Sequence, residues 1–143
     1  MKILVPVDGS PASIRAVKLA IDHVKKLTAE ASLVLVNVQN FSTVGLPEGT
    51  EVMPSAWLEQ KEERAASEAL KEAVTACRKA GIRYVTRAER GGVAEAIDRV
   101  ARKEHVEHIF MGTRGLGGVR GLLLGSVATQ LLHLVDVPTT LVK

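Results

Sequence analysis

The hydrophobic and polar positions along the chain follow two alternating patterns. Short and nearly continuous apolar runs, typical of strands buried on both faces of a sheet, are separated by longer amphipathic segments. The apolar runs predict five strands, at residues 2–7, 31–38, 82–89, 106–111 and 138–142. Pro6 argues against a central strand because it has no N–H group to donate, but the apolar run around it favours the strand.

The amphipathic segments predict four helices. They run from Ser10-Pro11, from near Ser55 to Gly81, over residues 92–104, and from Gly125-Ser126 toward Pro138. Ser10 can accept a hydrogen bond from a free amide at the helix start, and Gly81 suits a left-handed helix end. Alternating strands and helices predict an α/β fold around a parallel sheet. In the last helix, the residues expected to face the sheet are Val127, Leu131, Leu134 and Val135.

Composition narrows the classes of function. The chain has 143 residues, 46% of them hydrophobic and 24% charged, which is typical of a single globular domain, here residues 1–143. The 19 basic residues are scattered and barely outnumber the 16 acidic ones, and only 3% of residues are aromatic, so we expect no nucleic-acid partner. The uncharged stretch 121–135 is too short to cross a membrane, and no signal-peptide core follows Lys2. We therefore expect a cytoplasmic protein that does not bind membranes.

Cysteine and histidine give no sign of a metal centre. Cys77 is the only cysteine, and its place on the apolar face of the second helix is typical of a small core residue. His105 and His108 are three positions apart, but the segment around them is predicted to be a strand and no third ligand follows. We expect no protein-held metal.

The strongest chemical signal is a cluster of glycines after the fourth strand. Six of the 12 glycines lie in residues 112–125, between that strand and the last helix. Glycine lets the backbone approach a phosphate closely, and a helix start offers free N–H groups to an anion. The alternative is that these glycines only permit a long turn. A second long connection, residues 39–54, is polar and could be functional or mobile.

The spacing Gly112-x2-Gly115-x9-Gly125-Ser126 resembles the nucleotide-binding signature of the universal stress protein family. The opening KILVPVDGSPAS and the later segments VEHIFMGTRG, RGLLLGSVATQLL and VPTTLVK are similar to that family's start and last third. The resemblance implies a Rossmann-like sheet of strand order 3-2-1-4-5 with helices on both faces. Strands one and four then lie side by side at a switch point, where ligands bind in open α/β sheets.

The resemblance also implies a set of residues that contact an adenine nucleotide. They are Asp8, Val38, Met111, Gly112, Arg114, Gly115, Gly125, Ser126 and Val127. Asp8 would accept hydrogen bonds from the ribose hydroxyls; the alternative is that it only forms a turn. Ser126 would contact a phosphate; the alternative is that it only caps its helix. Arg114 and Arg120 are the cations that could neutralise phosphate charge, or they are solvated surface residues. Mg²⁺ is expected through the phosphates of ATP, or of ADP or AMP.

The expected function is that of a cytosolic ATP-binding stress-response protein whose nucleotide sets its conformation or its choice of partner. Two alternatives remain: a slow ATPase, and a dimerisation or signalling module that works without nucleotide. No Walker lysine is present, and Asp8 is the single candidate to position a water molecule. The resemblance further implies a homodimer formed through the C-terminal strand, residues 138–142.

Overall fold

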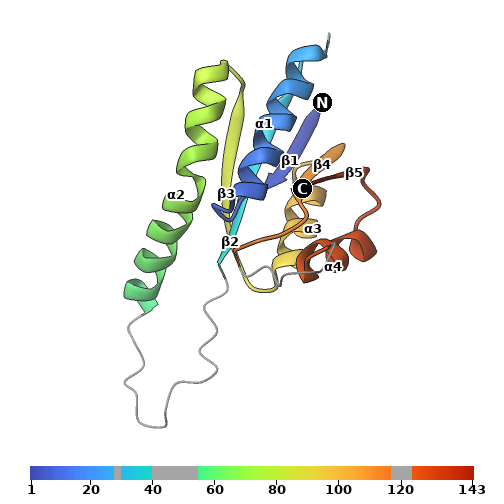
Figure 1. The fold of residues 1–143 in the computed structure, drawn as a ribbon. Coiled ribbons are helices and arrows are strands. Elements are labelled where there is room, and N and C mark those ends of the chain that lie inside the picture. The colour runs from blue at the N-terminus through green and yellow to red at the C-terminus, as the bar shows by residue number, and fades with distance from the viewer. Residues whose placement is uncertain (28–29, 40–54, 117–123) are drawn as a thin grey trace.

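The computed structural model describes residues 1–27, 30–39, 55–116 and 124–143 (Figure 1). These residues form five strands and four helices in strict alternation. The elements are β1 (Lys2–Pro6), α1 (Pro11–Lys26), β2 (Ser32–Gln39), α2 (Ser55–Ala80), β3 (Tyr84–Arg90), α3 (Val93–Lys103), β4 (His108–Gly112), α4 (Ser126–Leu134) and β5 (Thr139–Val142). Every predicted strand and helix is present, with ends that differ by a few residues.

The strands form one parallel sheet in the order β3-β2-β1-β4-β5. The chain first builds outward from β1 through β2 to β3, and then crosses to the other side of β1 for β4 and β5. Strands β1 and β4 therefore lie side by side at the point where the strand order reverses. The α/β fold and the order 3-2-1-4-5 are confirmed.

The sheet lies between two helical layers, α1 with α2 and α3 with α4 (Figure 1). A hydrophobic core fills the space on each side of the sheet. Because side chains alternate along a strand, Ile3 and Val5 of β1 face α1 and α2, whereas Leu4 faces α3 and α4. The same alternation places Leu33 and Val34 of β2 in opposite cores. Burial on both faces explains the continuous apolar runs of the central strands.

Pro6 is accommodated at the end of central strand β1. The Val7 amide donates to the Val36 carbonyl of β2 at 2.8 Å, so the nitrogen of the preceding residue faces the opposite neighbour, β4. The pairing of β1 with β4 ends at Leu4. Pro6 therefore removes no donor that the ladder uses.

The predicted helix signals act as expected at two places. The Ser10 side chain accepts a hydrogen bond from the Ser13 amide at 3.2 Å and so caps α1. Gly81 follows α2 with a φ of +68°, in the left-handed region. On α1 the apolar residues that recur at helical spacing, Ile14, Val17, Ile21 and Val24, are buried, while Arg15 and Lys18 are exposed.

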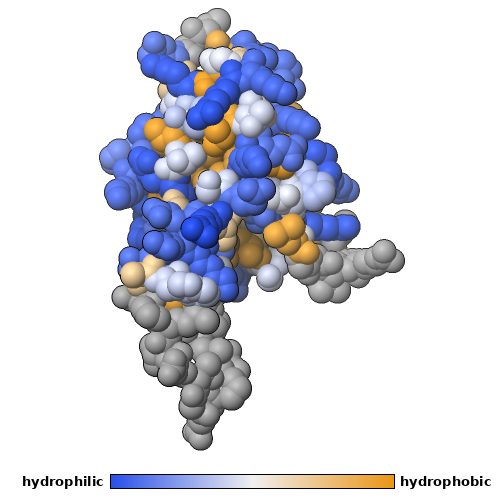
Figure 2. Space-filling model, turned by 90° about the vertical axis from the view of Figure 1, so that its left-hand side faces the viewer, coloured by the Kyte–Doolittle hydropathy of each residue, from blue (hydrophilic) through white to orange (hydrophobic). Residues whose placement is uncertain are grey.

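Other expectations need correction. Leu134, predicted to face the sheet, is 38% exposed, because the face of α4 that reaches the core carries Val127, Ala128 and Leu131, and Leu134 is the last residue of the helix beside that face. Strand β3 has a neighbour on one side only, and Val85 on it is 41% exposed. Figure 2 shows the side of the molecule where α2 lies, with hydrophobic side chains visible between hydrophilic ones. Arg120 and residues 40–54 lie outside the described residues.

Among the described helices, none combines the length and the hydropathy that crossing a membrane would require.

Candidate functional site

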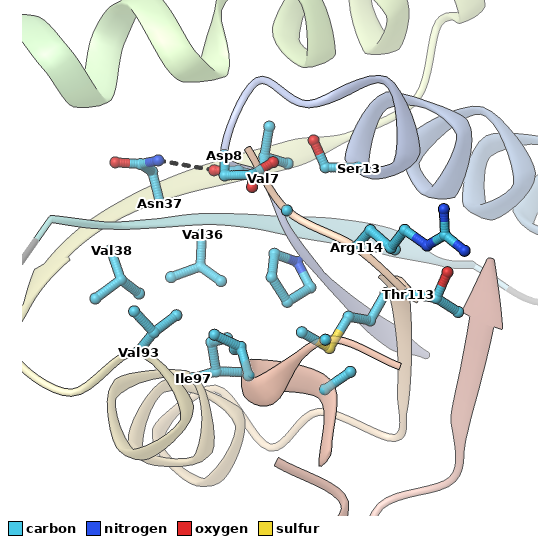
Figure 3. A pocket seen from close by; sticks show the side chains of 17 residues that line it. Val7, Asp8, Ser13, Val36, Asn37, Val38, Val93, Ile97, Thr113 and Arg114 are labelled. Carbon is cyan, nitrogen blue, oxygen red and sulfur yellow. Dashed lines mark hydrogen bonds between the residues drawn. The ribbon is translucent and has the colours of Figure 1, made fainter. Parts of the chain in front are cut away.

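A pocket opens at the carboxyl ends of β1, β2 and β4, beside the start of α4 (Figure 3). It holds about 170 Å³, less than the roughly 300–1,000 Å³ of a pocket that engulfs a drug-sized ligand, so a larger ligand would bury one part here and leave the rest outside. The lining residues are Pro6, Val7, Asp8, Ser13, Val36, Asn37, Val38, Val93, Ile97, Met111, Gly112, Thr113, Arg114, Gly115, Gly125, Val127 and Ala128. The pocket lies at the switch point that the fold predicts.

One side of the pocket is apolar. Figure 3 shows Val36 and Val38 of β2 facing Val93 and Ile97 of α3 across this side. Met111, at the end of β4, is 7% exposed and belongs to the same core as Val36. A flat, weakly polar ring system fits such a surface, because it buries apolar area and leaves ring polar atoms to meet the strand ends.

The other side of the pocket is polar and is organised by Asp8. One carboxylate oxygen of Asp8 accepts a hydrogen bond from the Ser10 amide at 2.9 Å, and this bond stabilises the turn into α1. The second oxygen accepts the Leu116 amide at 3.0 Å and so holds the start of the glycine-rich connection against β1. Asp8 therefore has the turn role that the sequence left open, and its side chain also borders the pocket.

Glycine is required in the wall of the pocket by close packing. A Cβ atom on Gly112 would lie 2.9 Å from the backbone carbon of Ala12 at the start of α1. On Gly115 it would lie 2.7 Å from Asp8 Oδ2, and on Gly125 it would lie 3.2 Å from the Thr113 carbonyl oxygen. At such distances a side chain would clash with its neighbours or force them to move. The three glycines therefore let the backbone that lines the pocket pack closely against the elements behind it.

The start of α4 differs from the simple cap that the sequence allowed. Gly125 is the N-cap residue and Ser126 is the first residue of the helix, so Ser126 is not a plain N-cap. No side chain among the described residues caps this end, and Ser126 is exposed. Its hydroxyl is therefore accessible next to free helix amides, although Ser126 is not among the residues that line the pocket.

The structure thus brings together most of the predicted residues. Eight of the nine line one pocket: Asp8, Val38, Met111, Gly112, Arg114, Gly115, Gly125 and Val127. Arg114 is exposed at its rim.

Asn37 is a pocket residue that the sequence reading missed. It is 3% exposed, its Nδ2 donates to the Val7 carbonyl at 2.7 Å, and its Oδ1 accepts from Gln39 at 2.6 Å. It thereby ties the end of β2 to the residue before Asp8 (Figure 3). An amide inside the otherwise apolar run of β2 was the available signal, because a buried polar side chain needs partners.

Shifted pKa values occur outside this pocket. Burial raises the pKa of the Cys77 thiol to about 11, so this fully buried side chain stays protonated at neutral pH, as a core residue does. His108 Nε2 lies 2.9 Å from the Thr140 hydroxyl. In the described parts of the chain, no group of three histidine, cysteine or acidic side chains is arranged to hold a metal ion.

Comparison with known proteins places the whole chain in one family. The profile described as the universal stress protein family matches residues 1–143. A universal stress protein of Methanocaldococcus jannaschii is 35% identical over 144 residues, which cover 99% of this chain and 81% of that protein. Universal stress protein YxiE of Bacillus subtilis is 29% identical over 145 residues, covering 99% of this chain and 98% of that protein.

Solved structures have the same fold. A hypothetical protein whose biochemical function was assigned from its structure has a TM-score of 0.82 at 24% identity, covering 99% of this chain and 94% of that one. A universal stress protein in complex with cAMP has a TM-score of 0.72 at 21% identity, covering 100% and 97%. A family protein of Arabidopsis thaliana with AMP bound has a TM-score of 0.69 at 17% identity, covering 100% and 91%. At these identities the structures show the shared fold, and the profile match over residues 1–143 shows that the chain belongs to the universal stress protein family.

Proposed function

We propose that this chain binds an adenine nucleotide in the pocket between β1 and β4. The proposal rests on one observation: an apolar recess, a wall of glycines and a helix start without a side-chain cap lie together at the switch point of the sheet. Universal stress proteins with cAMP and with AMP bound support adenine nucleotides as the ligand class.

The adenine ring would lie in the apolar recess, against Met111 and the end of β2 at Val38. The ribose would lie beside Asp8 and Gly112, and the phosphates would extend past Gly115 toward the start of α4. In this orientation the adenine ring, the least polar part of the ligand, lies in the apolar part of the pocket, and the charged phosphates lie at its solvent-exposed end.

At the phosphate end, Gly125, Ser126 and Val127 would donate from the first turn of α4, and Arg114 would offset charge at the rim. We infer ATP as the physiological ligand, with ADP or AMP as alternatives. Mg²⁺ would be held mainly by the phosphates, because the described residues near the pocket supply one carboxylate, Asp8.

The bound nucleotide would act as a signal. The chain would work as one domain of residues 1–143 in the cytoplasm, with the nucleotide setting its conformation or its choice of partner in a stress response. Hydrolysis is the weaker alternative, since Asp8 is the one carboxylate among the described residues that line the pocket, and no lysine lines it to stabilise a transferred phosphoryl group.

The test is titration calorimetry with ATP and AMP on the purified chain, after any nucleotide that copurifies has been identified by denaturation. Wild type should bind both, and Ser126→Ala should weaken ATP about fivefold, the effect of losing one hydrogen bond to a charged group in a partly exposed site. Gln130→Ala, an exposed change further along α4, is the matched control. No binding at millimolar nucleotide would reject the proposal.

We also propose a homodimer formed through β5. This strand pairs with β4 alone. The carbonyl oxygens of Pro138 and Val142 accept hydrogen bonds from the Ile109 and Thr113 amides, so these two residues direct their backbone groups toward β4. Because successive residues of a strand alternate, the N–H and C=O groups of Thr139 point away from β4, toward the free edge. Its free edge could pair with the same edge of a second copy.

Replacing Thr139 with proline removes one outward N–H without removing a β4–β5 bond. Thr139→Pro should therefore sediment as a monomer, whereas Thr139→Val, which keeps the N–H, should remain a dimer. A dimeric Thr139→Pro chain, or a monomeric wild type, would contradict an interface at β5.

A further inference from the structure

A second pocket adjoins the nucleotide pocket, and cationic side chains line it. Its walls are Ala12 and Arg15 of α1, Thr113 and Arg114 after β4, and Lys143 after β5, and it holds about 350 Å³. Thr113 and Arg114 line both pockets, so the two share one wall. Arg15 lies 97 positions before the glycine signature, which begins at Gly112, and the fold brings it beside Lys143 and Arg114.

Three positively charged side chains line this pocket, and no acidic side chain is among the described residues that line it. Arg15, Arg114 and Lys143 are all exposed, and none of them forms an ion pair within the described parts of the chain. Five other arginines do pair with carboxylates: Arg83, Arg87, Arg90, Arg99 and Arg102. Cationic side chains that gather without acidic side chains to pair with them create a positive potential that attracts anions.

The two arginine side chains are oriented so that they can donate hydrogen bonds to an anion in this pocket. The Arg15 Nε donates to the main-chain oxygen of Lys143 at 2.5 Å, which fixes the side chain and leaves its terminal nitrogens for another acceptor. Figure 3 shows the Arg114 side chain pointing away from Val36 and Val38 and toward α1. A planar guanidinium group offers paired N–H donors, which match the oxygens of a phosphate.

We infer that this basic pocket, formed by Arg15, Arg114 and Lys143, binds phosphate groups. They come either from the distal phosphates of the nucleotide in the adjoining pocket or from a separate oligophosphate. The first source rests on the proposed function, because the nucleotide would have to extend over the shared wall at Arg114. The second source does not depend on it.

The experiment uses inorganic tripolyphosphate as the probe, measured by calorimetry on the whole chain without nucleotide. Wild type should bind it, and binding should weaken as salt is raised. Arg15→Gln and Lys143→Gln should each weaken binding about fivefold, the effect of removing one exposed ionic contact. Lys18→Gln removes the same charge from the exposed face of α1 outside the pocket and should change nothing.

Repeating the titration on protein saturated with ATP or with AMP identifies the source. If the distal phosphates of the nucleotide fill the pocket, ATP blocks tripolyphosphate and AMP does not. If a separate oligophosphate fills it, tripolyphosphate binds equally in both cases. Variant-sensitive tripolyphosphate binding in a chain that binds no nucleotide would support this pocket while rejecting the nucleotide proposal. Absence of tripolyphosphate binding, or binding that neither variant weakens, would overturn the inference.

Discussion

Single residues of the site serve the fold and the pocket together. Gly112 ends β4 and lines the pocket, yet its missing side chain is required by the backbone of α1 behind it. Asp8 likewise borders the pocket while both its oxygens fasten neighbouring loops. A residue in this motif can therefore be essential without touching a ligand, and substitutions must separate the two roles.

Gly112→Ala should destabilise the chain even without ligand. The added methyl group would lie 2.9 Å from the backbone carbon of Ala12, and backbone cannot rotate away as a side chain can. Overpacking of this kind costs about 1–3 kcal/mol, to be measured as a lower free energy of unfolding in urea. Gly92→Ala is the matched control, because its methyl group would meet only the end of the exposed Glu95 side chain, which can rotate away. Equal stability of Gly112→Ala and wild type would show that packing does not demand this glycine.

His108 should make stability depend on pH near neutrality. Burial, and secondly the nearby His23, lower its pKa below the ordinary 6.5, so the unfolded chain takes up a proton more readily than the folded chain. The free energy of unfolding should therefore be highest, as far as His108 is concerned, above pH 6.5 and should decrease as the pH falls below 6.5.

His108→Gln keeps a donor for Thr140 and removes the titration, so the loss of stability between pH 7.5 and pH 5.5 should shrink. The measurement is urea unfolding of both chains at the two pH values. Glu104, whose pKa is lowered by hydrogen bonds from Lys2 and Arg87, loses its contribution only below about pH 4.5 and does not interfere. An equal pH dependence in both chains would reject His108 as the group responsible.

At the scale of the elements, the start of α1 holds the site in place. The Ser10 cap lies two residues after Asp8, is 3% exposed, and accepts the Ser13 amide. Ser10→Ala would leave that amide buried without a partner and should lower the free energy of unfolding by about 1–2 kcal/mol.

Chemical denaturation of Ser10→Ala checks this, beside Ser67→Ala on the exposed face of α2, which should be nearly neutral. If the two variants were equally stable, the cap would contribute nothing to α1.

Sequence patterns predicted the elements because each signal acts locally. The Ser10 cap, the Gly81 stop and the apolar runs depend on neighbours in the chain, and all are confirmed. Leu134 was wrongly expected to be buried, because which apolar residues of α4 reach the core depends on how the helix packs on the sheet. For Ser126 the signature fixed its position beside a helix start but not its exact place in the first turn.

For the site, the resemblance to a known family supplied the residues that local patterns could not combine. Asp8 and Gly112 are more than a hundred positions apart, and only the order of the strands makes them neighbours. Neither Asn37 nor the pair Arg15 and Lys143 is among the residues that the resemblance assigns to the ligand. Asn37 meets the first pocket, and Arg15 meets Lys143 at the second, only in three dimensions.

At the scale of the whole molecule, the reversal of strand order between β1 and β4 explains why the chemistry gathers at one edge. The loops that follow these adjacent strands run to opposite helical layers, and the crevice between them receives the carboxyl ends of β1, β2 and β4. Two full cores beneath keep the strand ends rigid, so a ligand meets a largely formed recess.

Binding of an adenine nucleotide in this crevice can be tested directly. Backbone amide NMR of the isotope-labelled chain, recorded while ATP is added, tests both the binding and its place. If the nucleotide binds there, the largest shifts will occur at Val38, Gly112 and Gly115, with little change on the far face of α2. Spectra unchanged at millimolar ATP, or shifts centred away from these strand ends, would contradict it.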